Sequence, residues 1–276
     1  MSTPFTLIND HGLEILGDTH TPEGAPVACA LILHGYKGYK DYGFIPVLAH
    51  DLCERGIMVH RFNFSTSGMT NDIETFARPD LFALDTWTRQ VDDVRRVVRA
   101  VREGEIAGTD LPLFLIGHSR GGATALLSAG RHRDELKLAG AITINAVDRC
   151  CRMTRDEQHA MLERGYAMTE SARTKQQLRI DAGWLREQID SPTDHDVLVQ
   201  TSRCKIPICV MHGDADDAVE IDAGLAIAHK LQTPLFLLEG ANHVLNMPNP
   251  SEVSSPRSEP LLEATDEMTR FIHEHA

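Results

Sequence analysis

The segment LFLIGHSRGG, residues 113–122, combines the signals of a buried strand, a sharp turn and a helix. Residues 113–116 are all apolar, which predicts a strand buried on both faces. Residues 123–131 have helical character. Ser119 lies at the junction, with Gly117 and Gly121 two residues to either side. This pattern predicts that a strand-to-helix turn raises the Ser119 hydroxyl above the sheet. Ser119 is therefore a candidate nucleophile.

The two glycines have a steric explanation in such a turn. The serine adopts strained backbone angles, and side chains at positions 117 and 121 would clash with the neighbouring backbone. The amide that follows the serine, that of Arg120, then lies at a helix N-terminus, where negative charge is favoured. The alternative is that Ser119 only caps the helix in a tight turn.

The rest of the chain alternates strand and helix patterns. Near-continuous apolar strands between amphipathic helices predict an α/β fold with a mostly parallel central sheet and helices on both faces. Ligands bind such sheets at the carboxyl ends of the strands. The predicted strands are 5–8, 13–16, 27–35, 57–64, 111–117, 138–147, 207–213 and 234–240, and the predicted helices are 44–54, 83–103, 123–131 and 259–275.

Residues 148–203 interrupt this alternation. The segment is charged and helix-prone and contains no apolar run suited to a core strand. We interpret it as a small helical cap inserted over the carboxyl edge of the sheet, with residues 1–147 and 204–276 forming the core. Apolar side chains of the cap are candidates for lining a substrate pocket, although packing within the cap is the favoured explanation for each one taken singly: Met153, Met161, Tyr166, Met168 and Trp184.

Composition limits the classes of partner. The chain has 276 residues and a formal net charge of −13, which disfavours nucleic acid and anionic membranes as partners. The N-terminus lacks the pattern of a signal peptide, and no stretch is apolar enough to span a bilayer. We therefore expect a cytoplasmic location, with the six cysteines as free thiols and no metal site. The oligomeric state stays open, and a homo-oligomer is compatible with the sequence.

A serine nucleophile needs a base and an acid that orients it. In this type of fold they follow the serine in the order acid, then histidine. His243 lies in a Gly/Asn turn after strand 234–240 and is the predicted base. Three aspartates follow strand 207–213. Asp214 is suited to shaping the turn, Asp217 to an exposed position, and Asp216 is the predicted acid.

An oxyanion hole needs two backbone N–H groups aimed at one point. The amide of Arg120 is one candidate, and the amide of Tyr36, in the loop after strand 27–35, is the other. We expect His34 to brace that loop. For the Arg120 side chain we expect a salt bridge with a nearby carboxylate, with a substrate contact as the alternative. This chemistry requires no cofactor.

Five segments together resemble the α/β-hydrolase superfamily over nearly the whole chain: LILHGYKG, HRFNFSTSG, GHSRGG, HGDADDAV and GANHV. The family pattern Gly-x-x-Asp-x-x-Val falls on Gly213, Asp216 and Val219, which favours Asp216 as the acid. RFNFSTSG resembles the esterase branch that includes bacterial cinnamoyl (feruloyl) esterases, although Asn63 stands where that branch has aspartate.

The resemblance implies a serine hydrolase that cleaves small or medium carboxylic esters through an acyl-enzyme. Its partner would be a small-molecule ester. An amidase or peptidase, an acyltransferase and a non-catalytic ligand-binding protein are the alternatives.

Overall fold

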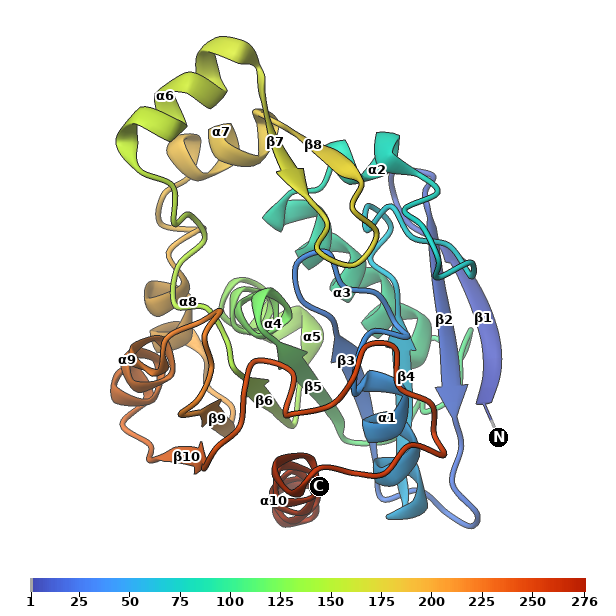
Figure 1. Cartoon of the computed structure of the whole chain (residues 1–276). Helices are drawn as coiled ribbons and strands as arrows, with labels where there is room; N and C mark the ends of the chain where they lie inside the picture. Colours follow the sequence, from blue (N-terminus) through green and yellow to red (C-terminus); the bar gives the residue numbers. More distant parts are fainter. Residues whose placement is uncertain (1) are drawn as a thin grey trace.

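The computed structural model describes residues 2–276 and contains an eight-stranded sheet (Figure 1). The strand order is β1-β2-β4-β3-β5-β6-β9-β10. The pairs β1/β2 and β2/β4 are antiparallel, and every other pair is parallel. The strands are β1 Ser2–Ile8, β2 Glu14–His20, β3 Ala28–Leu33, β4 Ile57–Phe62, β5 Leu113–His118, β6 Gly140–Ile144, β9 Ile208–Gly213 and β10 Leu235–Leu238.

Helices cover both faces of this sheet, and each face has its own apolar cluster. One cluster joins the sheet to α1 (Ile45–Glu54) and α10 (Glu259–His275). The other joins it to α3 (Trp87–Arg102), α4 (Arg120–Arg131) and α9 (Ile221–Leu231). The residues of β3, β4, β5, β6 and β9 are all buried, as expected for strands covered on both sides. The predicted fold class is confirmed.

Two helices differ from their predicted limits. The helix predicted at 83–103 begins instead at Trp87, as α3, and a separate short helix, α2 (Pro79–Ala83), precedes it. The cause is Thr86, whose side chain accepts a hydrogen bond from the Arg89 amide and so caps the start of α3. Helix α4 begins at Arg120, directly after Ser119, and the short α5 (Arg133–Leu136) follows it.

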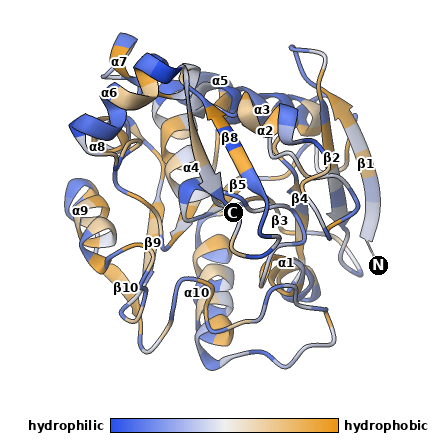
Figure 2. Ribbon diagram, turned by 45° about the horizontal axis from the view of Figure 1, so that its top comes forward, coloured by the Kyte–Doolittle hydropathy of each residue, from blue (hydrophilic) through white to orange (hydrophobic). Residues whose placement is uncertain are grey.

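The segment predicted as a helical cap also contains a β-hairpin, which we did not predict. It comprises α6 (Arg155–Arg164), the antiparallel strands β7 (Tyr166–Glu170) and β8 (Gln177–Asp181), and α7 (Gly183–Asp190). Polar and apolar residues alternate along β8 (Figure 2), which is typical of a strand with one solvated face. The last helix of the segment, α8 (Val197–Arg203), packs against α4 of the core.

Polar contacts attach the hairpin to the core. The Gln176 side chain accepts a hydrogen bond from the Phe76 amide at 2.8 Å and donates one to the Phe76 carbonyl at 3.2 Å. Lys37 Nζ donates to the Glu170 carbonyl at 2.6 Å. The hairpin is therefore bound to two loops that follow core strands.

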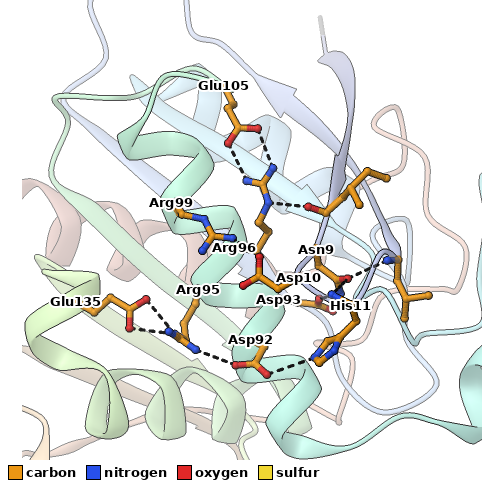
Figure 3. Close-up of polar contacts among 12 residues, drawn as sticks. Asn9, Asp10, His11, Asp92, Asp93, Arg95, Arg96, Arg99, Glu105 and Glu135 are labelled. Atoms are coloured by element: carbon orange, nitrogen blue, oxygen red, sulfur yellow. Dashed lines mark hydrogen bonds and ion pairs between the residues drawn. The ribbon is translucent and has the colours of Figure 1, made fainter.

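The N-terminal hairpin β1–β2 is bound to α3 by the contacts in Figure 3. Asn9 Nδ2 donates to Asp93 Oδ1 at 2.7 Å, and Arg96 Nε donates to the Ile8 carbonyl at 2.8 Å. Asn9 Oδ1 accepts hydrogen bonds from the amides of His11 and Leu13, which closes the turn of the hairpin.

All six cysteines are unpaired. Within residues 2–276, no helix is both long and apolar enough to cross a bilayer. The same residues contain no group of three or more His, Cys, Asp or Glu side chains placed to hold a metal ion.

Candidate active site

Ser119 occupies a strained turn between β5 and α4. Its φ of 56° and ψ of −123° are unusual for a residue with a side chain. Its hydroxyl makes no capping hydrogen bond to α4, which argues against the helix-cap alternative. A strained serine at this corner has the geometry of a nucleophile elbow.

The structure contains the steric reason for both neighbouring glycines. A Cβ atom on Gly117 would overlap the backbone of the first turn of α4, including Gly122 Cα at 2.5 Å. A Cβ atom on Gly121 would overlap the carbonyl oxygens of Leu33 and His34, the latter at 2.6 Å. The absence of side chains at these two positions therefore allows α4 to pack against β5 and the end of β3.

Asp216 and His243 form a hydrogen-bonded pair. His243 Nδ1 lies 2.8 Å from Asp216 Oδ2, and the aspartate side chain is completely buried. Asp216 Oδ1 accepts hydrogen bonds from the amides of Ala218 and Val219, each at 2.9 Å. Burial raises the pKa of Asp216, but the hydrogen bonds from His243 and these amides outweigh burial and hold the pKa below its ordinary value. The carboxylate is therefore ionised and fixed in orientation.

Of the three candidate aspartates, Asp216 alone contacts His243. Asp214 is exposed, and its Oδ1 accepts a hydrogen bond from the Gly240 amide at 2.6 Å. Asp214 thus joins the loop after β9 to the loop after β10. Asp217 is exposed to solvent.

Ser119 and His243 line one cavity of about 530 Å³ between the core and the cap segment. This volume is in the usual range for small-molecule sites. Of the five cap residues proposed from sequence, Met153, Met161 and Trp184 line it, whereas Tyr166 and Met168 do not. The other lining residues are Tyr36, Phe82, Asp85, Trp87, Arg120, Val147, Arg149, Cys150, Arg152, Glu157, Ala167, Ile180, Ala218 and Val219.

The loop after β3 lies directly beside the nucleophile. A Cβ atom on Gly35 would come within 3.0 Å of Ser119 Cβ and 3.4 Å of its Oγ, so a side chain at position 35 would crowd the nucleophile. Tyr36 follows Gly35 and lines the same cavity as Arg120. His34 Nδ1 donates to the Gly35 carbonyl at 2.9 Å, and its Nε2 accepts from the Phe64 amide at 3.2 Å. Burial lowers the His34 pKa to about 4, so this residue is neutral and braces the loop, as expected.

The Arg120 side chain forms the expected salt bridge. Its Nη1 lies 2.8 Å from Asp85 Oδ2, and both side chains are buried. The guanidinium also lies over the Trp87 ring, 4.4 Å from the centroid.

A strained serine beside a histidine–aspartate pair, at the carboxyl edge of a mostly parallel sheet, defines an α/β-hydrolase. The comparisons with known proteins agree. Residues 24–254 match the family described as serine aminopeptidase, S33, and the chain belongs to this family of hydrolases. A search of curated protein sequences found no match.

Solved structures share the fold at low sequence identity. The esterase domain of a Rhodothermus marinus protein is 19% identical, with a TM-score of 0.67 over 100% of this chain and 99% of that one. Est1E from Butyrivibrio proteoclasticus, with ferulic acid bound, is 17% identical, with a TM-score of 0.73 over 98% of each chain. A puromycin-hydrolysing peptidase from Mycobacterium tuberculosis is 17% identical, with a TM-score of 0.64 over 99% of this chain and 39% of that one.

Proposed function

We propose that this protein is a serine carboxylesterase acting on small or medium acyl or aryl esters, with Ser119 as nucleophile, His243 as base and Asp216 as orienting acid. The observation that carries the proposal is the 2.8 Å bond between His243 Nδ1 and Asp216, next to a cavity that His243 shares with the strained Ser119. The esterases of the same fold, one with ferulic acid bound, support an ester as the substrate.

The proposed reaction begins with attack of Ser119 Oγ on the ester carbonyl carbon. His243 Nε2 takes the serine proton, because the bond from Nδ1–H to Asp216 leaves Nε2 unprotonated and stabilises the imidazolium that forms. The amides of Tyr36 and Arg120 stabilise the negative charge on the carbonyl oxygen. His243 then protonates the departing alcohol, and an acyl-enzyme remains.

In the second half of the reaction, His243 takes a proton from water, and the resulting hydroxide attacks the acyl carbon. The second tetrahedral intermediate expels Ser119 Oγ, which recovers its proton from His243. The products are a carboxylic acid and an alcohol. No cofactor enters either half of this scheme.

A second candidate is amide or peptide hydrolysis by the same three residues. It is favoured by the description of the family as serine aminopeptidases and by the puromycin-hydrolysing peptidase of the same fold. A pair of substrates with one acyl group, a p-nitrophenyl ester and the p-nitroanilide, separates the two activities. For each substrate, the catalysed rate is divided by the uncatalysed rate. A larger ratio for the anilide than for the ester would replace the esterase proposal with a peptidase.

The main experiment measures hydrolysis of p-nitrophenyl esters from acetate to decanoate and of methyl hydroxycinnamates. Ser119→Ala is assayed beside the native protein, and both are treated with a fluorophosphonate. The proposal requires turnover by the native protein, labelling of the native protein, and loss of both in Ser119→Ala. Absence of turnover and labelling in the native protein would instead support a ligand-binding protein, and acyl transfer to an added alcohol would support an acyltransferase.

A further inference from the structure

Asn145 lies directly after β6, at the centre of the carboxyl edge of the sheet, and is completely buried. Its side chain bonds two segments that are far apart in the sequence. Asn145 Oδ1 accepts a hydrogen bond from the Gly213 amide at 2.8 Å. Its Nδ2 donates to the carbonyls of Asn242 at 3.2 Å and His243 at 3.0 Å. One amide group therefore contacts both the strand that precedes Asp216 and the loop that carries His243.

Both the side chain and the backbone at this position favour asparagine. Three hydrogen bonds use both donors and the acceptor of the amide. The φ of 50° is in the left-handed region, which asparagine adopts more readily than most residues. The backbone amide of Asn145 donates to the Met211 carbonyl at 3.0 Å, which continues the ladder between β6 and β9. Aspartate has the same shape but lacks the two donors that face the carbonyls.

The carbonyl of His243 receives a second hydrogen bond. His118 Nε2 lies 2.7 Å from it, and the two imidazole rings are 4.7 Å apart between centroids. Burial lowers the pKa of His118 to about 3, so its ring is neutral and donates through Nε2–H. His118 comes from the strand that carries Ser119. The backbone of the proposed base is thus bonded to the strand of the nucleophile as well as to Asn145.

Other contacts attach the two ends of the loop around His243: the Gly240 amide donates to Asp214 Oδ1, the Ala215 amide donates to the Ala241 carbonyl at 3.1 Å, and Ser258 Oγ donates to the Leu245 carbonyl. Asn242 and Asn246 bond each other's backbone amides, at 2.8 and 3.0 Å, and these contacts are internal to the loop. Such bonds shape the turn but do not determine where it lies on the sheet. The bond from His243 to Asp216 fixes the imidazole, whereas Asn145 and His118 fix the backbone that carries it.

We propose that Asn145 is a positioning residue: by bonding Gly213 together with Asn242 and His243, it sets the place of the base relative to the acid and the nucleophile. This inference rests on the proposed function of Ser119, Asp216 and His243. Displacement of a catalytic group by about 1 Å can lower a rate about 100-fold. The proposal therefore predicts an effect on the chemical step that exceeds any effect on substrate binding.

The test compares Asn145→Asp with the native protein on the best ester of the panel. We expect kcat to fall about 10- to 100-fold while KM changes less than about threefold, because the cavity lining is intact. We also expect loss of the downfield proton resonance of the His243 Nδ1–H group, which Asp216→Asn serves to assign. A purely structural role would not produce this combination.

The matched control is Asn9→Asp. Asn9 is also a buried asparagine with side-chain bonds to several segments, but it lies on the N-terminal hairpin at α3 (Figure 3). Placing a carboxylate beside Asp93 lowers stability without touching the site. We expect native kcat and a native downfield resonance in Asn9→Asp at a temperature where it is folded.

If Asn145→Asp does not fold, Asn145→Gly replaces it, because glycine accepts the positive φ and removes the amide. The inference is overturned if the folded variant keeps kcat within about threefold of native, or if the resonance persists. The resonance is visible whether or not an ester is hydrolysed. Absence of Ser119-dependent turnover therefore refutes the proposed function, whereas the resonance still decides the role of Asn145.

Discussion

Arg120 and Asp85 form a buried ion pair in the lining of the cavity that contains the nucleophile. Arg120 Nη1 and Asp85 Oδ2 are 2.8 Å apart, and the two side chains are only 8% and 7% exposed. Asp85 Oδ1 also accepts hydrogen bonds from Thr66 Oγ1 at 2.8 Å and Gln90 Nε2 at 3.1 Å. Burial raises the pKa of Asp85, and the charge of Arg120 opposes this rise. The pair joins the start of α4 to the segment that precedes α3.

Removal of one partner should be strongly destabilising, because the other charge stays buried. We expect Asp85→Ala to lower the free energy of unfolding by about 3–5 kcal/mol, measured by urea denaturation. Asp80→Ala is the control, since Asp80 and its partner Arg78 are both exposed and solvent screens their attraction, so we expect a much smaller loss. Equal losses in the two variants would contradict this account of the buried pair.

The two glycines at the turn should tolerate no side chain. In Gly121→Ala the new Cβ meets backbone carbonyls that cannot rotate away, so we expect a loss of about 3 kcal/mol or more in stability. Gly183→Ala is the matched control. It lies at the start of α7, where an added Cβ would have no other atom within 4 Å, and we expect a gain of up to about 1 kcal/mol. Thermal unfolding of both variants provides the comparison, and a stable Gly121→Ala protein would be inconsistent with the packing of α4 against β3.

The identity of the acid is tested by three isosteric substitutions. Asp216→Asn removes the negative charge that orients His243, and we expect kcat to fall about 10³- to 10⁴-fold. Asp217→Asn and Asp214→Asn alter exposed side chains and should change kcat less than about threefold. Steady-state ester hydrolysis at neutral pH measures all three. A large loss in Asp217→Asn instead of Asp216→Asn would move the acid to another residue.

Much of the core could be predicted because strands buried on both faces appear as uninterrupted apolar runs. β5 is an example: Leu113 to Ile116 are all apolar in sequence and all buried in the structure. The turn at Ser119 was also recognisable, because its steric demands require glycine at two positions close in sequence. The contact between Asp216 and His243 followed from chain order and from the ends of two neighbouring parallel strands.

Other features could not be predicted, for physical reasons. β7 and β8 are partly exposed and have only five residues each, so the alternation along β8 is a short signal within a segment whose composition favours helix. The role of Asn145 depends on backbone groups from two distant segments and on a positive φ, neither of which leaves a pattern in the sequence. Its place directly after a core strand was the one available signal.

Four buried histidines should make the protein sensitive to acid. Burial lowers the pKa to about 4 in His20, His34 and His60 and to about 3 in His118. In the unfolded chain a histidine titrates near 6.5, so between about pH 6.5 and 4 the unfolded state binds more protons than the folded state. Stability therefore falls as pH falls through this window. Asp93 and Asp85 act in the opposite direction, since burial raises the pKa of both, that of Asp93 to about 6, but they are two groups against four.

His60→Gln tests the sign and the size of this pH dependence of stability. His60 Nε2 contacts the Ala107 carbonyl and Nδ1 contacts Thr19 Oγ1, each at 2.9 Å, and glutamine can supply both a donor and an acceptor. Each extra proton bound by the unfolded state contributes about 1.4 kcal/mol per pH unit. We therefore expect the slope of unfolding free energy against pH, measured in urea between about pH 6 and 4.5, to decrease by about this amount in His60→Gln. His159→Gln replaces an exposed side chain and should leave the slope unchanged. An unchanged slope in His60→Gln would show that His60 takes up its proton without unfolding.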